Sequence, residues 1–107
     1  MANPAHLEIL QQGVAVWNQW RESAGKIKPD LSGANLSKAN LRSANLSRAN
    51  LRGANFRGAN LSGARISDAT LRWATLFGAN LIDADLSRGD LSRTDLRRAN
   101  LTSTSYK

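Results

Sequence analysis

Side chains that could carry acid–base or metal chemistry are few in this sequence of 107 residues. It has one histidine, His6, and no cysteine, which excludes multi-histidine metal sites, thiolate zinc sites, disulfides and cysteine nucleophiles. Four carboxylates lie close together in the sequence, at Asp83, Asp85, Asp90 and Asp95. Carboxylates that converge in a pocket bind divalent cations or act as an acid–base pair. Whether these four converge depends on the elements that position them.

Basic side chains outnumber acidic ones. The sequence has 15 Lys and Arg against 8 Asp and Glu, a formal net charge of +7. Such a charge favours an acidic partner, either a nucleic acid or an acidic protein. The apolar stretches are too short to span a membrane, and the N-terminus lacks the apolar run of a secretory signal. We therefore expect no membrane association and a cytoplasmic location.

From residue 29 onward the sequence repeats every five residues. A large apolar residue occupies one position of the unit fifteen times without interruption, from Leu31 to Leu101. Two residues earlier stands alanine in most units, and the residue between is mostly Asn or Asp. A period of five fits neither an amphipathic helix nor an alternating strand. Two inward residues around an outward one make a short extended piece, and the next two, with glycine in last place in five units, make a corner. This pattern predicts coils that stack through main-chain hydrogen bonds.

The tandem Ala-Asn-Leu-x-x units over residues 29–107 resemble the pentapeptide repeat protein family, a bacterial family with many cyanobacterial members. The resemblance implies an all-β solenoid, a right-handed quadrilateral β-helix in which four units make one coil. With twenty residues to a coil, the repeats make about four coils.

Residues 1–28 do not follow the repeat. The pair Asn3-Pro4 is typical of a helix start, and Gly25 can end a helix. Between them the apolar residues recur at helical spacing. We expect one helix over roughly residues 4–23 that caps the first coil, followed by a linker to the β-helix of residues 29–107, all in a single structural domain. The residues expected to plug the coil are Leu7, Leu10, Val14, Trp17 and Trp20.

Stacking at twenty residues assigns the outward side chains to four faces. Faces one to four are numbered from their first apolar residues, Leu31, Leu36, Leu41 and Leu46. Asp85, Asp90 and Asp95 then point from successive faces, so these carboxylates cannot converge on one ion or substrate. Asp83 and Asp85 share neighbouring corners and could make only a weak cation contact. We therefore expect neither an enzyme nor a metal or cofactor site.

Faces three and four are predicted to be structural. On face four, opposite charges stack at Arg48, Asp68 and Arg88, and Arg65 lies next to Asp85; such cross-strand pairs stabilise a sheet. Face three carries an asparagine ladder that could satisfy itself, made of Asn40, Asn60, Asn80 and Asn100.

Faces one and two combine arginines with aromatic residues. Phe77 lies between Arg57 and Arg97 in the stack, an arrangement that permits cation–π contacts. Trp73 points outward at the corner between the two faces, and arginine with tryptophan is typical of binding hot spots. We predict an interaction patch here, called the arginine–aromatic surface, made of Arg52, Arg57, Arg72, Trp73, Phe77, Arg97 and Arg98. The alternative is that these solvated arginines only cover the column.

The C-terminal end has no helix in its sequence pattern, and its last coil is the least regular. It could offer an open edge to a second copy, which predicts a homodimer through Leu91, Leu96, Leu101 and Tyr106. Alternatively, the polar residues of this coil simply make the end soluble.

These features favour a non-catalytic scaffold that presents flat faces to an unidentified, acidic protein partner. The alternative is a nucleic-acid-binding module that uses the basic faces, although the basic residues reach all four faces rather than one stripe. Some members of the resembled family bind DNA gyrase by mimicking duplex DNA. That mimicry needs an acidic exterior, so the charge of +7 argues against it.

Overall fold

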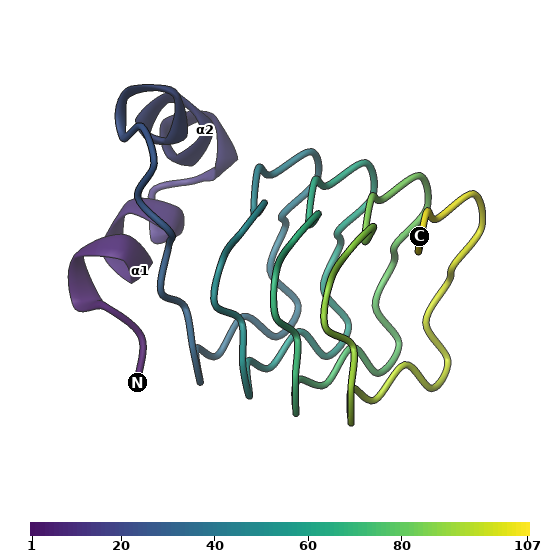
Figure 1. The fold of residues 1–107 in the computed structure, drawn as a ribbon. Helices are drawn as coiled ribbons and strands as arrows, with labels where there is room; N and C mark the ends of the chain where they lie inside the picture. Colours follow the sequence, from purple (N-terminus) through teal and green to yellow (C-terminus); the bar gives the residue numbers. More distant parts are fainter.

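The computed structural model describes residues 1–107 and shows two short helices followed by stacked coils (Figure 1). Helix α1 spans Pro4–Gln11 and helix α2 spans Val14–Ser23. Neither has the length and apolar character that crossing a membrane requires. The helices lie at one end of the coiled region, and the C-terminus lies at the other (Figure 1).

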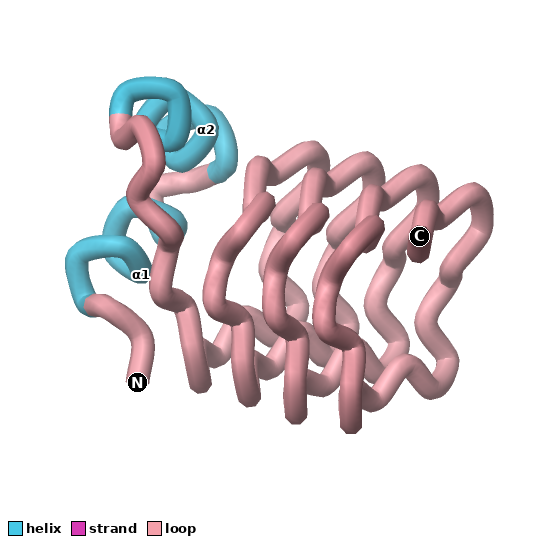
Figure 2. Tube along the Cα trace, viewed as in Figure 1, coloured by secondary structure: helices cyan, strands magenta, loops and turns pink.

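Neighbouring coils are joined by parallel bridges between residues twenty positions apart, from Asp30 with Asn50 to Asp85 with Ser105. Because the unit is five residues long, four units complete each turn. Each bridge is isolated, since the extended piece between two corners is too short for a regular strand. Figure 2 accordingly draws everything outside the two helices as loop. The twenty-residue register predicted from the sequence is therefore present.

Every corner from Gly33 to Ser103 places its last residue at positive φ, between 58° and 69°. In the first corner the carbonyl of Leu31 accepts a hydrogen bond from the N–H of Ala34 at 3.1 Å. Glycine adopts this conformation without strain, but ten of the corner residues are not glycine. The neighbouring coil holds them in place: the N–H of Lys38, for example, donates to the carbonyl of Arg57 at 2.8 Å.

The Asn and Asp residues of the repeat bind the corner that follows them. In the face-three column, the Oδ1 atoms of Asn60 and Asn80 accept hydrogen bonds from the N–H two residues ahead, at 3.1 and 3.0 Å. The self-satisfying asparagine ladder predicted for face three is therefore wrong. These short side chains reach their own backbone more readily than the next coil. Asn40 and Asn100 bind their corners in the same way.

Leucine and alanine columns fill the interior. The core contains 24 buried apolar residues, and Phe56 takes a leucine position with no exposed surface. Two threonines replace alanine near the C-terminal end. Their hydroxyls donate to main-chain carbonyls, Thr94 to Leu71 at 2.8 Å and Thr104 to Leu81 at 2.6 Å. The polar replacements in the last coil are thus satisfied internally.

The N-terminal segment contains two helices where the sequence predicted one. Gly13 separates them, with φ 109° and ψ 162°. Glycine adopts this positive-φ conformation readily, but it is not helical, so the helix is interrupted here. The helix start is as predicted, because the Oδ1 of Asn3 accepts from the N–H of Ala5 at 2.9 Å. Of the predicted inward residues, Leu10 and Trp17 are buried. Leu7, Val14 and Trp20 are partly buried against the core.

The helices hydrogen-bond to the first coil on faces four and one and at the corner between faces three and four, where the Nδ2 of Asn18 donates to the carbonyl of Ser43 at 3.0 Å. On face four the indole Nε1 of Trp17 donates to the carbonyl of Asn45 at 2.7 Å. Arg21 donates to the carbonyls of Asn45 and Ser47 at 2.7 and 2.9 Å. Its guanidinium is buried without a carboxylate partner, and burial, followed by the charges of two nearby arginines, lowers its pKa. No feature of the sequence pattern indicated that Arg21 would be buried.

On face one the contact is made by His6 and Asn3. The N–H of Asp30 donates to the Nδ1 of His6 at 3.0 Å, and the N–H of Asn3 donates to the carbonyl of Asp30 at 2.9 Å. The imidazole ring also contacts Trp20, with ring centroids 5.0 Å apart. His6 thus attaches α1 to the first coil.

Candidate interaction surface

Phe77 lies under three guanidinium groups on face two. The twenty-residue register places Arg57 and Arg97 on either side of its ring, and their Cζ atoms lie 4.3 and 5.5 Å from the ring centroid. Arg98 approaches to 5.8 Å. Contacts of this kind at exposed sites each contribute about 0.5–1 kcal/mol. The ring is half-buried, so this cluster offers a partner the arginines and only part of the aromatic face.

Trp73 is the exposed aromatic residue of the surface, with 51% of its area accessible. It occupies a corner at φ 66°, a conformation that is strained for a bulky side chain. Arg93 lies twenty residues further on, and its Cζ is 4.9 Å from the centroid of the indole. The predicted patch omitted Arg93. The register could have found it, because Arg93 occupies the same position of the next coil.

The acidic residues of faces one and two are engaged by their own coil. Arg97 forms an ion pair with Asp95 at 2.9 Å, and hydrogen bonds from Arg97 lower the pKa of Asp95. The carboxylate of Asp90 accepts hydrogen bonds from the hydroxyl and N–H of Ser92, which lower its pKa. The remaining predicted arginines are exposed and form no ion pair within 4.0 Å: Arg52, Arg57, Arg72 and Arg98.

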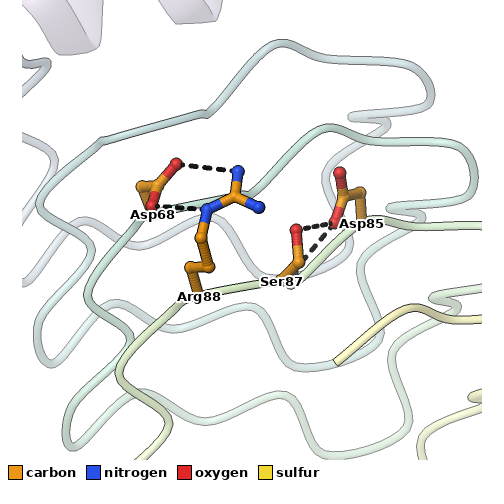
Figure 3. Close-up of polar contacts among 4 residues, drawn as sticks. All are labelled: Asp68, Asp85, Ser87 and Arg88. Carbon is orange, nitrogen blue, oxygen red and sulfur yellow. Dashed lines mark hydrogen bonds and ion pairs between the residues drawn. The ribbon is translucent and has the colours of Figure 1, made fainter. Parts of the chain in front are cut away.

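Face four contains only part of the predicted charge ladder (Figure 3). Arg88 binds Asp68 in a fork, with Nε to Oδ1 at 3.1 Å and Nη2 to Oδ2 at 3.2 Å. Hydrogen bonding to Asp68 raises the pKa of Arg88. Arg48, on the other side of Asp68, has no ion pair.

The predicted pairing of Arg65 with Asp85 is present in the backbone but not between the side chains. Their main chains form a parallel bridge, yet no ion pair joins them. Asp85 instead accepts hydrogen bonds from the hydroxyl and N–H of Ser87 (Figure 3), and these lower its pKa. The nearby hydroxyl orients the carboxylate along its own strand rather than toward the arginine.

At the C-terminal end the predicted contact residues differ in exposure. Leu91, Leu96 and Leu101 are half-buried, whereas Tyr106 is exposed. The main-chain N–H groups of Leu91, Leu96 and Leu101 have no hydrogen-bond partner within the chain. This end is therefore an open sheet edge.

The acidic residues Asp83, Asp85, Asp90 and Asp95 do not form a cluster. No group of three or more His, Cys, Asp or Glu side chains is placed to hold a metal ion. The carboxylates of Asp85, Asp90 and Asp95 each bind the corner after them, which gives them a local structural role.

A protein-family comparison matches the model for pentapeptide repeats over residues 30–68 and 64–102. A comparison with curated proteins found no match. Similar solved structures include a pentapeptide repeat protein of the Arabidopsis thaliana thylakoid lumen, with 38% identity and a TM-score of 0.72. That match covers 73% of this chain and 54% of the other, so the chain spans about half the length of the Arabidopsis protein.

Two cyanobacterial structures are also similar. A pentapeptide repeat protein of Nostoc PCC 7120 has 34% identity and a TM-score of 0.67, covering 80% of this chain and 73% of its own. The pentapeptide repeat protein Rfr23 of Cyanothece 51142 has 32% identity and a TM-score of 0.59, and the match covers 78% of this chain and 68% of the Rfr23 chain. These neighbours imply a right-handed quadrilateral β-helix for the coiled region.

Proposed function

The chain belongs to the pentapeptide repeat family, and we propose that it is a non-catalytic interaction module whose arginine–aromatic surface binds an acidic protein. The family is generally a non-enzymatic structural fold. The observation that carries the proposal is that arginines surround both aromatic residues of the surface. Arg93 lies over the exposed Trp73, and Phe77 lies under Arg57, Arg97 and Arg98. Tryptophan and arginine side chains dominate binding energy at protein interfaces.

The surrounding charge supports an acidic partner. Asp90 and Asp95 are held by Ser92 and Arg97, whereas Arg52 and Arg72 stack on face one without an ion pair. Asp90 lies near both guanidinium groups, but its single charge balances only one of them. A partner carboxylate would balance the other and strengthen the complex.

The proposed module is a β-helix of about four coils, over residues 29–107, with α1 and α2 as its N-terminal cap. The contacts of Trp17, Arg21 and His6 with the first coil support the capping role. Such a scaffold is rigid, because each coil is tied to the next by regular main-chain bonds, and rigid faces lose little entropy on binding.

The double variant Arg72→Glu/Trp73→Ala is expected to abolish capture of the native partner in a pull-down from the source cell. The variant removes the exposed indole and reverses a charge on face one, while both side chains lie outside the core. The control is Arg48→Glu, on face four, an exposed arginine without an ion pair, which should leave capture unchanged. Unchanged capture by the double variant would contradict the proposal.

The second candidate function is nucleic-acid binding, which the net charge of +7 favours. In that case the module should bind duplex DNA with an affinity that falls steeply with salt, because released counterions drive such binding. The unpaired arginines reach several faces rather than one stripe, so we favour the acidic protein. The same charge disfavours the DNA-mimic function of gyrase-binding relatives.

A homodimer through the C-terminal coil is also proposed. The exposed Tyr106 and the open edge of Leu91, Leu96 and Leu101 support it, since a twofold axis would pair two such edges antiparallel. Sedimentation at rising protein concentration should show a dimer, and Leu96→Arg should keep the protein monomeric. A wild-type protein that stays monomeric at high concentration would rule the dimer out.

A further inference from the structure

The helices leave half of the N-terminal edge of the first coil open. Asp30 on face one and Asn45 on face four both have their main-chain N–H and C=O groups paired with α1, its N-cap Asn3 or α2. On faces two and three the equivalent residues are Asn35 and Asn40. Their main-chain N–H and C=O groups have no partner within the chain, and both residues are exposed.

The open edge is oriented like every edge inside the column. One coil further on, the N–H of Asn55 donates to the carbonyl of Ala34 at 2.9 Å, and its carbonyl accepts from the N–H of Leu36 at 2.7 Å. Asn35 and Asn40 point the same groups away from the column. They present two donor–acceptor pairs in the register of a parallel strand, which is how added strands are recognised.

A hollow lined by both apolar and polar residues lies beside these groups. This hollow, the N-terminal notch, has a volume of about 240 Å³ and lies at the end of α1, beside Gly13 between the two helices. Its apolar walls are Leu10, Leu36, Ala39 and Leu41, and its rim includes Asn35 and Asn40. An inward-pointing aliphatic side chain of an added strand would enter it.

The coils beside the notch carry charge of one sign, whereas α1 adds a single carboxylate, Glu8. Residues 31–67 contain six basic side chains and no Asp or Glu. Lys38 and Arg42 lie nearest in sequence to the open edge, both are exposed, and neither has an ion pair. Charges of this kind act over about 8 Å at physiological salt. The edge therefore favours an acidic strand over a neutral or basic one.

We propose that this open edge binds an extended acidic segment of another protein, which pairs with the main chain of Asn35 and Asn40 and places an apolar side chain in the N-terminal notch. The segment follows the register of a preceding coil. Its N–H groups donate to the carbonyls of Asn35 and Asn40, and its carbonyls accept from their N–H groups. This site is distinct from the arginine–aromatic surface and does not depend on it.

The probe is the octapeptide acetyl-Ala-Asp-Leu-Asp-Gly-Ala-Asp-Leu-amide, which carries aspartate at the outward positions, leucine at the inward ones and glycine at the corner. Added to the protein of residues 1–107, it should slow hydrogen exchange at the N–H groups of Asn35 and Asn40 by about tenfold or more, since exchange follows opening of the hydrogen bond. A scrambled octapeptide of the same composition should not. Protection confined to Trp73 and Phe77 would overturn the site while leaving the proposed function intact.

N-methylation of the two leucines of the probe tests the main-chain pairing without altering the protein. It removes the donors to the carbonyls of Asn35 and Asn40 and keeps side chains and charge, so the affinity should fall by about tenfold or more. Equal affinity of both peptides would overturn the proposal. If raising the protein concentration alone protects Asn35 and Asn40, the occupant is a second copy of the chain, and the assignment to a foreign segment is overturned.

A matched pair of variants tests the charge. Lys38→Glu/Arg42→Glu should weaken binding of the octapeptide by about tenfold, because close opposite charges steer and hold such ligands. Arg72→Glu/Arg98→Glu changes the net charge equally but lies on the arginine–aromatic surface, and its effect should be much smaller. Equal weakening by both variants would show attraction to the overall charge only and would overturn the site.

Discussion

Trp17→Ala is expected to lower the free energy of unfolding by about 3–5 kcal/mol, the range for removing a large buried aromatic side chain. Trp17 has no exposed surface, and its ring packs against Trp20 with centroids 5.0 Å apart. Its indole also donates to the carbonyl of Asn45 at 2.7 Å. The variant therefore loses apolar contact and a hydrogen bond at the junction of α2 with the first coil.

The loss should appear as a lower midpoint in urea denaturation followed by circular dichroism. The control is Val16→Ala, one residue earlier in α2, whose side chain is 40% exposed; it should change stability by only about 0.5 kcal/mol or less. Equal stability of the wild type and Trp17→Ala would show that the helices do not stabilise the coils, and would remove the capping role proposed for them.

Leu61→Ala is expected to destabilise the protein by about 2–5 kcal/mol, the range for truncating a fully buried leucine. Leu61 has no exposed surface and lies in the face-three column between Leu41 and Leu81, both also buried. Coils on both sides hold the main chain through regular bonds, so the cavity cannot collapse easily. The measured loss of unfolding free energy should therefore include the full cost of the unfilled cavity.

Leu101→Ala is the matched control, because it removes the same atoms from the same column in the last coil. Leu101 is half-buried and has no following coil, so less apolar surface returns to water and the loss should be clearly smaller. Denaturation of both variants in urea provides the comparison. Equal losses would mean that the C-terminal end is covered in solution, as in the proposed homodimer.

Most of the coiled region follows from residue type and spacing. The uninterrupted apolar position from Leu31 to Leu101 and the alanine two residues before it predict the core, and both positions are buried through most of the coils. Extending the period to twenty residues correctly placed Arg57 and Arg97 around Phe77. The same register would have paired Arg93 with Trp73.

Side-chain hydrogen bonding was predicted less well. The register showed which residues are neighbours. Where a side chain has several partners within reach, local backbone geometry decides which hydrogen bond forms. Asn60 binds the N–H two residues ahead rather than the next asparagine. Asp85 binds Ser87 rather than Arg65. In both cases the side chain forms a hydrogen bond with the residue two positions ahead in its own corner, because that partner is nearer than the next coil.

By itself, the sequence determined the repeat, its core, the twenty-residue register and the excess of positive charge, because these depend on periodicity and composition. Only the tertiary structure decided how the N-terminal segment meets the first coil. The break at Gly13 turns α2 so that Trp17 and Arg21 reach face four, while His6 holds face one. Faces two and three keep an open edge as a result. No period encodes that outcome, since it depends on contacts between residues more than twenty positions apart in a segment that does not repeat.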